Sequence, residues 1–457
     1  MGESKLSNVS NAELLQKVRD AAQKTTGYKR INALFDAGSF NEIDCFAKSD
    51  DNYSEAVAGY GTVEGCPAYA FAQNCDIEGG AMSKAQAAKI KKVYDLAVKT
   101  GAPVIGIYDS KGGKLKQGSD ILAAYGEILR NANNLSGVVP QISLVLGPCV
   151  GTSAMIAAGA DIVVMSKKAE LTINTSGENG SANEAEKLGI CQIVEADDKS
   201  AISTVRKLIT LLPSNNLSGT PVLELHGANN VIKLSNLNDN KAIINEICDE
   251  NSFIELSGKF GQSAVTGLSE IDGTTVGVVA LSGVIDADSC SKAARFVMFC
   301  DAFSLPIVTF VNAEKFTTLR EASKLSCSYS EATTAKITVI TGSAYGPVYI
   351  AIAGKGANAD YTMAWPNAVV SSLAPETGAI FLWNDRLKGS KNPVEDRKKL
   401  IEEYKATEAS PLSAAANGFI EDIINPEDTR IRIITNLEML SSKRVSRLPK
   451  KHSNIQR

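Results

Sequence analysis

The sequence has few of the side chains that enzymes most often use for acid–base and metal chemistry. It contains two histidines, His226 and His452, and nine cysteines, none of which form a C-x-x-C pair. This composition argues against a zinc site of the usual spacing, and no metal is expected. An odd number of cysteines in a chain of 457 residues is also more typical of a reducing compartment than of a disulfide framework.

Long apolar runs and an excess of basic charge are missing too. No run reaches the length of a transmembrane helix, and the polar start, MGESKLSNVSNAELLQ, lacks the apolar core of a signal peptide. The formal net charge of −4 argues against nucleic acid as a partner. The sequence therefore predicts a cytoplasmic protein and leaves open whether it docks at the periphery of a membrane complex.

Motifs for nucleotide binding and nucleophilic catalysis are also absent. Neither G-x-x-x-x-G-K-[ST] nor G-x-S-x-G occurs in the chain. Cys149 follows a predicted strand, which is a place for a nucleophile, but its apolar neighbours favour a small core residue. Capping or turn roles explain Asp109, Asp286 and Asp288 better than acid catalysis does. His226 lies in a polar segment, which is typical of a surface or turn residue.

What the sequence does contain is a stretch, 102–161, in which a buried strand twice ends in a Gly-rich turn before a helix. The apolar run 104–108 leads into DSKGGK (109–114), and the run 142–146 leads into GPCVGT (147–152). Backbone N–H groups at such turns point into a crevice beside the strand ends. A single turn of this kind often reflects tight packing alone. Two of them on successive strands favour a shared site for an oxygen that develops negative charge.

The surrounding segments predict further helices and strands. A helical region is expected over 10–37, a hairpin over 59–74 and a helix capped by Ser83 that ends at Gly101. The segment 175–189 is rich in Ser, Asn and Gly and is expected to be a loop, followed by a helix over 200–212. The polar segment 213–240 is expected to link two domains.

Beyond this linker the pattern of elements begins again. A hairpin is expected over 270–283, a Ser291-capped helix ends before Pro306, and strands over 307–311 and 337–340 match the two strands of the first half. Chance agreement between α/β segments is the alternative, but the repeated order of the features favours two tandem α/β units. The expected domains are 1–225 and 226–457.

Many segments together resemble the carboxyltransferase subunits of biotin-dependent acyl-CoA carboxylases and decarboxylases, such as propionyl-CoA carboxylase β and methylmalonyl-CoA decarboxylase α. They include LFDAGSFNEID, GAPVIGIYDSKGG, GVVPQISLVLGPCVG, EATTAKITVITGSAYG and GFIEDIINPEDTRIRI. The resemblance implies a tandem pair of crotonase-like α/β domains. It implies that the N-terminal domain binds the acyl-CoA and the C-terminal domain faces carboxybiotin on a separate carrier protein. Backbone amides would hold the thioester enolate and the biotin ureido oxygen.

The resemblance also places the site residues of the first half. The family's D-S-G-G-A-R falls on 109–114, which gives Gly112 and Gly113 as catalytic residues and Lys114 as a residue that binds the cofactor. The family's G-P-C-A-G-G falls on 147–152, which gives Gly151 and Thr152. Thr152 replaces a glycine, keeps its N–H and narrows the approach with its side chain.

The second half departs further from the family pattern. The family's D-V-P-G-F falls on 312–316, so that Lys315 replaces a glycine and Phe316 is the expected catalytic residue. The family's A-Y-G-G-A-Y falls on 344–349, which gives Gly346 and Val348 as catalytic residues and Tyr345 as cofactor-binding. Pro347 stands in place of the second glycine, and proline has no backbone N–H.

The resemblance leaves several functional alternatives open. The chain is expected to move a carboxyl group between a short acyl-CoA and carrier-bound biotin, in either the carboxylase or the decarboxylase direction. Expected partners are a biotin carboxyl carrier protein, a biotin carboxylase or membrane decarboxylase subunit, and further subunits of a homo- or hetero-oligomer. A divergent subunit of low activity, which assembles the complex or binds CoA, is the alternative. A third alternative is a crotonase-type hydratase or CoA hydrolase that acts without biotin, but the Gly-rich turns of this chain contain no candidate glutamates for it.

Overall fold

The chain divides into two compact units, Met1–Ser218 and Gly219–Arg457. The computed structural model describes residues 11–49, 52–53, 55–174, 180–222, 236–452 and 454. The division falls inside the polar segment 213–240 that the sequence predicts as a linker, and His226 lies outside the described residues. The domain boundary after residue 225 stays a prediction.

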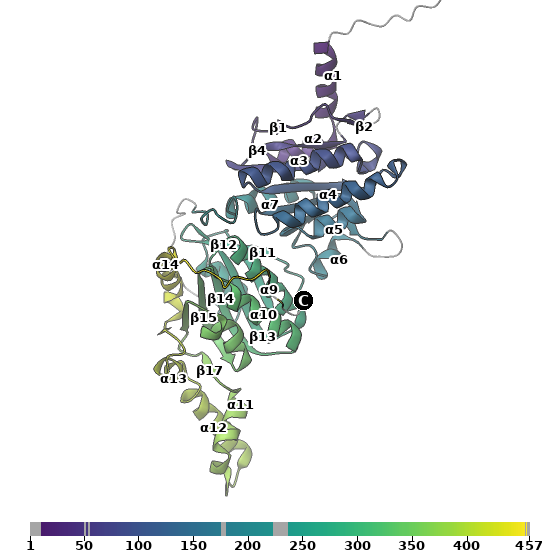
Figure 1. Cartoon of the computed structure of the whole chain (residues 1–457). Helices are drawn as coiled ribbons and strands as arrows, with labels where there is room; N and C mark the ends of the chain where they lie inside the picture. The colour runs from purple at the N-terminus through teal and green to yellow at the C-terminus, as the bar shows by residue number, and fades with distance from the viewer. Residues whose placement is uncertain are drawn as a thin grey trace, which may run out of the picture. The chain divides into compact units, whose positions relative to one another are not determined.

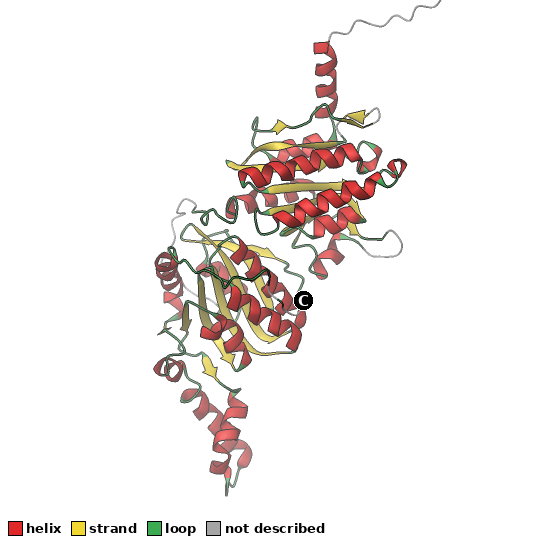
Figure 2. Ribbon diagram, viewed as in Figure 1, coloured by secondary structure: helices red, strands yellow, loops and turns green. Residues whose placement is uncertain are grey.

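The first unit is a mixed sheet between helices (Figures 1 and 2). Its strand order is β1-β4-β5-β6-β7-β8-β10, with β9 paired to β7. Helix α3 packs beside α4, and α2 packs beside α7. The helices are α1 Asn11–Gln23, α2 Thr26–Leu34, α3 Lys84–Thr100, α4 Asp120–Leu135, α5 Thr152–Ala158, α6 Ala182–Lys187 and α7 Asp198–Leu211. The strands are β1 Asn41–Glu42, β2 Lys48–Ser49, β3 Asn52–Tyr53, β4 Ala56–Val63, β5 Cys66–Gln73, β6 Val104–Ser110, β7 Gln141–Val150, β8 Ile162–Ser166, β9 Glu170–Thr172 and β10 Ile193–Glu195.

The second unit repeats this sheet strand for strand, in the order β11-β12-β13-β14-β15-β16-β18 with β17 paired to β15. Its helices are α8 Asn240–Ile247, α9 Ala287–Ala302, α10 Leu319–Glu331, α11 Pro375–Trp383, α12 Pro393–Ala406, α13 Pro411–Ala416 and α14 Thr429–Leu440. Its strands are β11 Ile254–Leu256, β12 Ala264–Ile271, β13 Thr274–Ile285, β14 Ile307–Phe316, β15 Lys336–Tyr345, β16 Tyr361–Ala364, β17 Val369–Ser371 and β18 Asp422–Ile423. The expected tandem α/β units are therefore confirmed.

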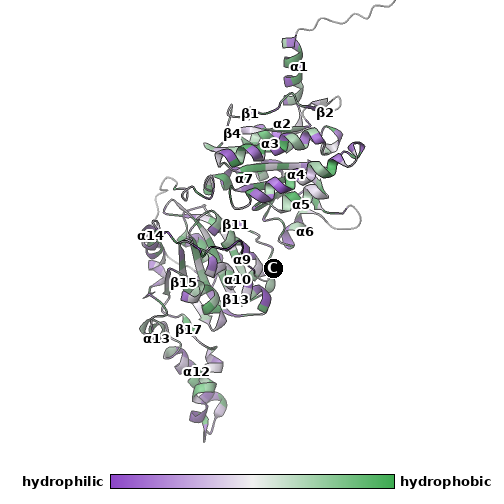
Figure 3. Cartoon of the chain, viewed as in Figure 1, coloured by the Kyte–Doolittle hydropathy of each residue, from purple (hydrophilic) through white to green (hydrophobic). Residues whose placement is uncertain are grey.

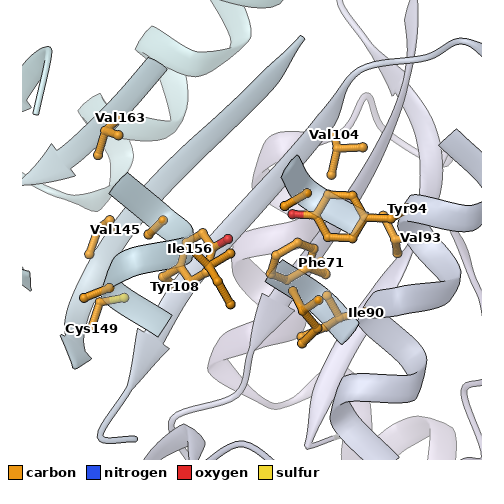
Figure 4. Packing of buried hydrophobic residues seen from close by; sticks show 14 of the residues in the cluster. Phe71, Ile90, Val93, Tyr94, Val104, Tyr108, Val145, Cys149, Ile156 and Val163 are labelled. Atoms are coloured by element: carbon orange, nitrogen blue, oxygen red, sulfur yellow. The ribbon is translucent and has the colours of Figure 1, made fainter. Parts of the chain in front are cut away.

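Each unit has its own apolar core. In the first unit, alternate residues of β6 and β7 turn their side chains toward α3 and α4, because strand side chains alternate between faces. Figure 4 shows Phe71, Tyr108 and Cys149 within this core, and Figure 3 shows apolar residues interleaved with polar ones along the helices. Across the described residues, no helix has both the length and the apolar character needed to span a bilayer.

Some helix termini match the positions predicted from the sequence, and others do not. Ser83 caps α3 by accepting the Gln86 N–H, and Gly101 ends that helix in the left-handed conformation, as predicted. The prediction that Ser291 caps α9 is wrong. The cap is Asp286, which accepts the Ser289 N–H, so Ser291 lies inside the helix.

Two further expectations need correction. The helical region expected over 10–37 is two helices, α1 and α2, because Thr25 has extended backbone and caps α2. The expected loop 175–189 contains the short helix α6, which Ser181 caps through the Glu184 N–H. Both breaks arise from hydroxyl side chains that satisfy helix N-termini.

A matching pair of charged residues secures the first hairpin of each unit. In the first unit, Asp36 accepts the N–H groups of Glu64 and Gly65 in the β4–β5 turn, and Arg206 of α7 donates to Asp36 over 2.9 Å. In the second unit, Asp249 accepts the N–H groups of the β12–β13 turn, and Arg430 of α14 donates to Asp249. The duplication therefore extends to individual side chains.

Asp36 makes the first of these clamps sensitive to acid. Its hydrogen bond from the Gly65 N–H is the largest cause that lowers the pKa of Asp36 from 3.8 to about 2. A lowered carboxyl pKa stabilises the fold above the unfolded-state pKa of about 3.9 and loses that stabilisation as the pH falls. We expect the difference in unfolding free energy between wild type and Asp36→Asn to be full above about pH 4 and to shrink toward about pH 2. Denaturant titrations across this range measure it, and a difference independent of pH would contradict the assignment.

Candidate functional site

The turn after β6 is fixed by backbone contacts with the segment before α3. The Met82 N–H donates to the Gly112 carbonyl over 2.8 Å, and the Lys114 N–H donates to the Met82 carbonyl over 2.8 Å. This parallel bridge pairs Met82 with Gly113 and leaves the N–H of Gly113 outside the bridge. Gly112 has φ 119°, a conformation that favours glycine.

The turn after β7 leads directly into α5. Gly151 is the residue before that helix and has φ 68°, and its N–H donates to the Thr172 carbonyl over 2.8 Å. Thr152 is the first residue of α5, so its N–H has no acceptor within the helix. Gly151 thus shapes the turn, and Thr152 presents the donor.

Among the described residues, the four predicted N–H donors of the first unit therefore divide into two that already have an acceptor and two that do not. The N–H groups of Gly112 and Gly151 are occupied, by the Ser110 hydroxyl oxygen over 3.2 Å and by Thr172 respectively. Within the described part of the chain, no hydrogen-bond partner is found for the N–H of Gly113 or of Thr152. The turn pair of the first unit, residues 109–114 and 147–152, thus offers one N–H donor after each of the strands β6 and β7.

Packing beneath this turn pair explains why a glycine stands at 113. A side chain there would overlap Ile121 of α4 and contact the Tyr125 ring. The Ser153 hydroxyl donates to the Tyr125 hydroxyl over 3.3 Å, and both side chains are buried. Helices α4 and α5 are therefore tied together directly behind the donors.

Lys114 is not a free cation at the surface. Its ammonium lies 2.8 Å from Glu55 and 3.4 Å from Glu78, and 3% of its side chain is exposed. Glu55 also accepts a hydrogen bond from Ser83, so the ion pair joins this turn to the start of α3. The predicted role of Lys114 in binding the cofactor stays a prediction, and it would require this pair to open.

In the second unit the equivalent segment is the end of β14, and it has the same register. Ile285 pairs with Phe316 as Met82 pairs with Gly113, and the Thr317 N–H donates to the Ile285 carbonyl over 3.0 Å. The N–H of Phe316 is therefore the counterpart of the Gly113 N–H. Because Phe316 stands where the first unit has Gly113, a half-buried aromatic ring lies beside this donor.

The turn after β15 matches the turn after β7 with one chemical difference. Gly346 has φ 55°, and its N–H donates to the Ser371 carbonyl over 2.9 Å, as Gly151 donates to Thr172. The next residue is Pro347, at the position of Thr152, and it has no N–H. Val348 follows with a buried side chain. The position that carries the Thr152 donor in the first unit thus has no donor in the second.

Tyr345 stands at the end of β15 and is half-buried. Burial, followed by the charges of Glu314 and Glu376, raises the pKa of Tyr345, so its hydroxyl stays protonated near neutral pH. It can donate a hydrogen bond to a ligand. Its predicted contact with the cofactor stays a prediction.

The remaining candidate acids and nucleophiles have structural roles. Cys149 is fully buried, and burial raises the pKa of its thiol, which confirms a core residue rather than a nucleophile. Asp286 caps α9. The expectation that Asp109 serves as a cap or turn residue is wrong, because it lies inside β6, where its carboxylate is a buried partner of Arg30 over 2.6 Å. Arg30 and Glu55 were not predicted, since both contact residues far away in the sequence.

Among the described residues there is no cluster of three or more His, Cys, Asp or Glu side chains that could hold a metal ion. Over the part of the chain that the structure describes, backbone N–H groups without a hydrogen-bond acceptor lie at two strand ends of the first unit, at Gly113 and Thr152. Such groups stabilise oxyanions.

The chain as a whole is similar to known carboxyltransferases. A family model described as the carboxyl transferase domain matches residues 19–455. Methylmalonyl-CoA decarboxylase subunit alpha from Propionigenium modestum is 34% identical over 486 residues, with 95% of this chain and 94% of that protein covered. The propionyl-CoA carboxylase carboxyltransferase subunit from Haloferax mediterranei is 34% identical, with 94% and 93% covered.

A solved structure agrees. The transcarboxylase 12S structure, described as a hexamer with hydrolysed methylmalonyl-coenzyme A bound, has a TM-score of 0.91 and 30% identity, with 99% of this chain and 100% of that chain covered. The chain belongs to the carboxyl transferase family. The predicted family, the tandem crotonase-like fold and the enzyme class, a carboxyltransferase, are thereby confirmed.

Proposed function

We propose that this chain moves a carboxyl group between a short acyl-CoA and biotin attached to a separate carrier protein. The observation that carries the proposal is the pair of N–H donors, Gly113 and Thr152, at adjacent strand ends of the first unit. The similarity to subunits that act on methylmalonyl-CoA and propionyl-CoA supports a CoA thioester as substrate.

In this proposal the first unit holds the thioester carbonyl oxygen. Loss or gain of a carboxyl group next to a thioester places negative charge on that oxygen in an enolate. The N–H groups of Gly113 and Thr152 stabilise that charge without reorganisation, because the bridge to Met82 and the start of α5 hold them in place. Gly112 and Gly151 contribute the positive φ values that the turns need.

The second unit is proposed to face the biotin. The residues that would hold its ureido oxygen are Phe316 and Val348 through their N–H groups, with Tyr345 as a neighbouring donor. Biotin would supply the carboxyl carrier and a nitrogen that accepts or releases the group. Pro347 removes one donor, so the residues fit the group less completely than those of the first unit fit a thioester.

Purified chain, incubated with methylmalonyl-CoA and free biotin, tests this function. We expect formation of propionyl-CoA that depends on both the chain and biotin, measured by chromatography of the CoA esters. Malonyl-CoA and free methylmalonate serve as comparison substrates. Absence of transfer from every short acyl-CoA tried, in a folded preparation, would refute the proposal.

Pro347 also supports a second candidate, a subunit of low activity that assembles the complex or binds CoA. For this candidate we expect affinity capture with the chain to recover an active sibling carboxyltransferase. We also expect the chain to bind an acyl-CoA with no turnover of its own. Full turnover by the chain alone would remove this candidate. The direction of transfer and the partners, a biotin carrier together with a biotin carboxylase or a membrane decarboxylase subunit, form part of the proposal and are not needed for either test.

A further inference from the structure

We propose that Arg30 is a positioning residue for the N–H donors of the first unit. Its guanidinium donates to the Asp109 carboxylate over 2.6 Å and to the Leu146 carbonyl over 3.3 Å. Asp109 lies near the end of β6 and Leu146 lies within β7, so one planar group joins the two strands. This inference rests on the proposed function, because it assigns Arg30 to the same thioester site.

The clamp is buried and closely fitted. Arg30 is 8% exposed and Asp109 is 6% exposed. A side chain at residue 147 would overlap the Asp109 carboxylate, so Gly147 is what allows the carboxylate to reach across to β7. Asp198, at the start of α7, accepts from Arg30 over 3.0 Å and anchors it from the other side.

The clamp lies at an irregularity in the pairing of the two strands. The register between β6 and β7 shifts between Tyr108 and Ser110, immediately around Asp109. The donors follow within the same two turns, Gly113 after β6 and Thr152 after β7. The strands pair again at Ser110 and Cys149, so the positions of the donors depend on how the irregular pairing before them is held, and the guanidinium holds it.

The second unit joins its strands without an arginine. Asn312 takes the place of Asp109, and its side-chain oxygen accepts the Ser343 N–H of β15 over 2.9 Å. A side chain at Gly342 would overlap Asn312, as one at Gly147 would overlap Asp109. In the first unit the residue after the glycine is Pro148, which has no N–H to donate. A direct bridge of this kind is thus impossible there, and Arg30 supplies the link instead.

The helix residue that matches Arg30 supports this reading. Helices α2 and α8 both end shortly before the aspartate of the hairpin clamp, and alignment on Asp36 and Asp249 places Ile243 where Arg30 stands. Ile243 is 1% exposed and apolar. At this helix position a buried charge is therefore present in the unit that lacks the direct bridge and absent in the unit that has it.

The test compares Arg30→Met and Arg30→Lys with a matched control, Arg206→Met. Arg206 makes the hairpin clamp of the same unit and donates to the Leu34 carbonyl, Asp36 and Glu64, none of which lies in β6 or β7. We expect kcat for carboxyl transfer to fall by about 10²-fold in Arg30→Met with a smaller change in KM for the acyl-CoA, because donors misplaced by about 1 Å cost that much. The kcat of Arg30→Lys is expected to lie between those of wild type and Arg30→Met, since an ammonium keeps the charge but cannot bond both strands in one plane. In Arg206→Met, kcat is expected to stay unchanged while the melting temperature falls.

A rescue variant separates positioning from folding. The triple variant R30I, D109N and P148S copies the second unit's bridge into the first, and we expect it to recover most of kcat, whereas R30I with D109N alone does not. Equal losses of kcat in Arg30→Met and Arg206→Met, or unchanged kcat in Arg30→Met, would overturn the inference. Inactive wild-type chain would instead refute the proposed function. Acyl-CoA affinity of the variants, measured by calorimetry, then shows whether Arg30→Met still binds the thioester like wild type, as a positioning role requires.

Discussion

Thr152→Pro is expected to lower kcat for carboxyl transfer by about 10²–10³, the usual cost of losing one donor of an oxyanion hole. Thr152 is the first residue of α5, a position where proline is tolerated because the N–H makes no bond within the helix. The second unit demonstrates this tolerance, since Pro347 occupies the same position. The substitution therefore removes a donor and leaves the fold intact.

Thr152→Ala is the matched control, because it removes the side chain and keeps the N–H. We expect its kcat to stay within a few-fold of wild type. Steady-state kinetics of both variants, with melting curves to confirm the fold, measure the effect. Equal activity of Thr152→Pro and wild type would show that this N–H plays no part in catalysis.

Pro347→Thr is expected to act in the opposite direction. It restores an N–H at the start of the turn after β15, at the position where Thr152 carries one in the first unit. If the second unit holds the biotin oxygen, a regained donor raises the rate of transfer to free biotin by about 10²–10³.

Pro393→Ala is the control for this gain, because Pro393 is also the first residue of a helix but lies in α12, away from β14 and β15. Its transfer rate is expected to match wild type. Rates are measured at limiting biotin, where the step at the second unit is most visible. A Pro347→Thr chain no faster than wild type would count against the biotin-facing role of the second unit.

The repeat and most strands could be predicted from the sequence because they depend on local patterns. Apolar runs flanked by glycine and proline located β6, β7, β14 and β15, and the order of features showed the duplication. The structure sharpens this to the level of hydrogen bonds, with Gly113 matched to Phe316 and Thr152 matched to Pro347.

The errors arose where short matches or distant contacts decide the structure. Ser291 was matched to Ser83 because both precede Lys-Ala, whereas the true counterpart of Ser83 is Asp286, a different residue that caps by the same chemistry. The partnership of Arg30 with Asp109 spans 79 residues, so no local pattern indicates it. For the same reason no local pattern indicates the buried pair of Lys114 with Glu55, which spans 59 residues.

Amide hydrogen exchange with and without a bound acyl-CoA tests the central claim, that the turn pair of the first unit holds the thioester oxygen. The account predicts slower exchange in peptides that contain Gly113 and Thr152. It predicts no change in peptides that contain Phe316 and Val348 unless biotin is also present. Protection confined to the second unit, or protection absent from both turns at saturating acyl-CoA, would contradict it.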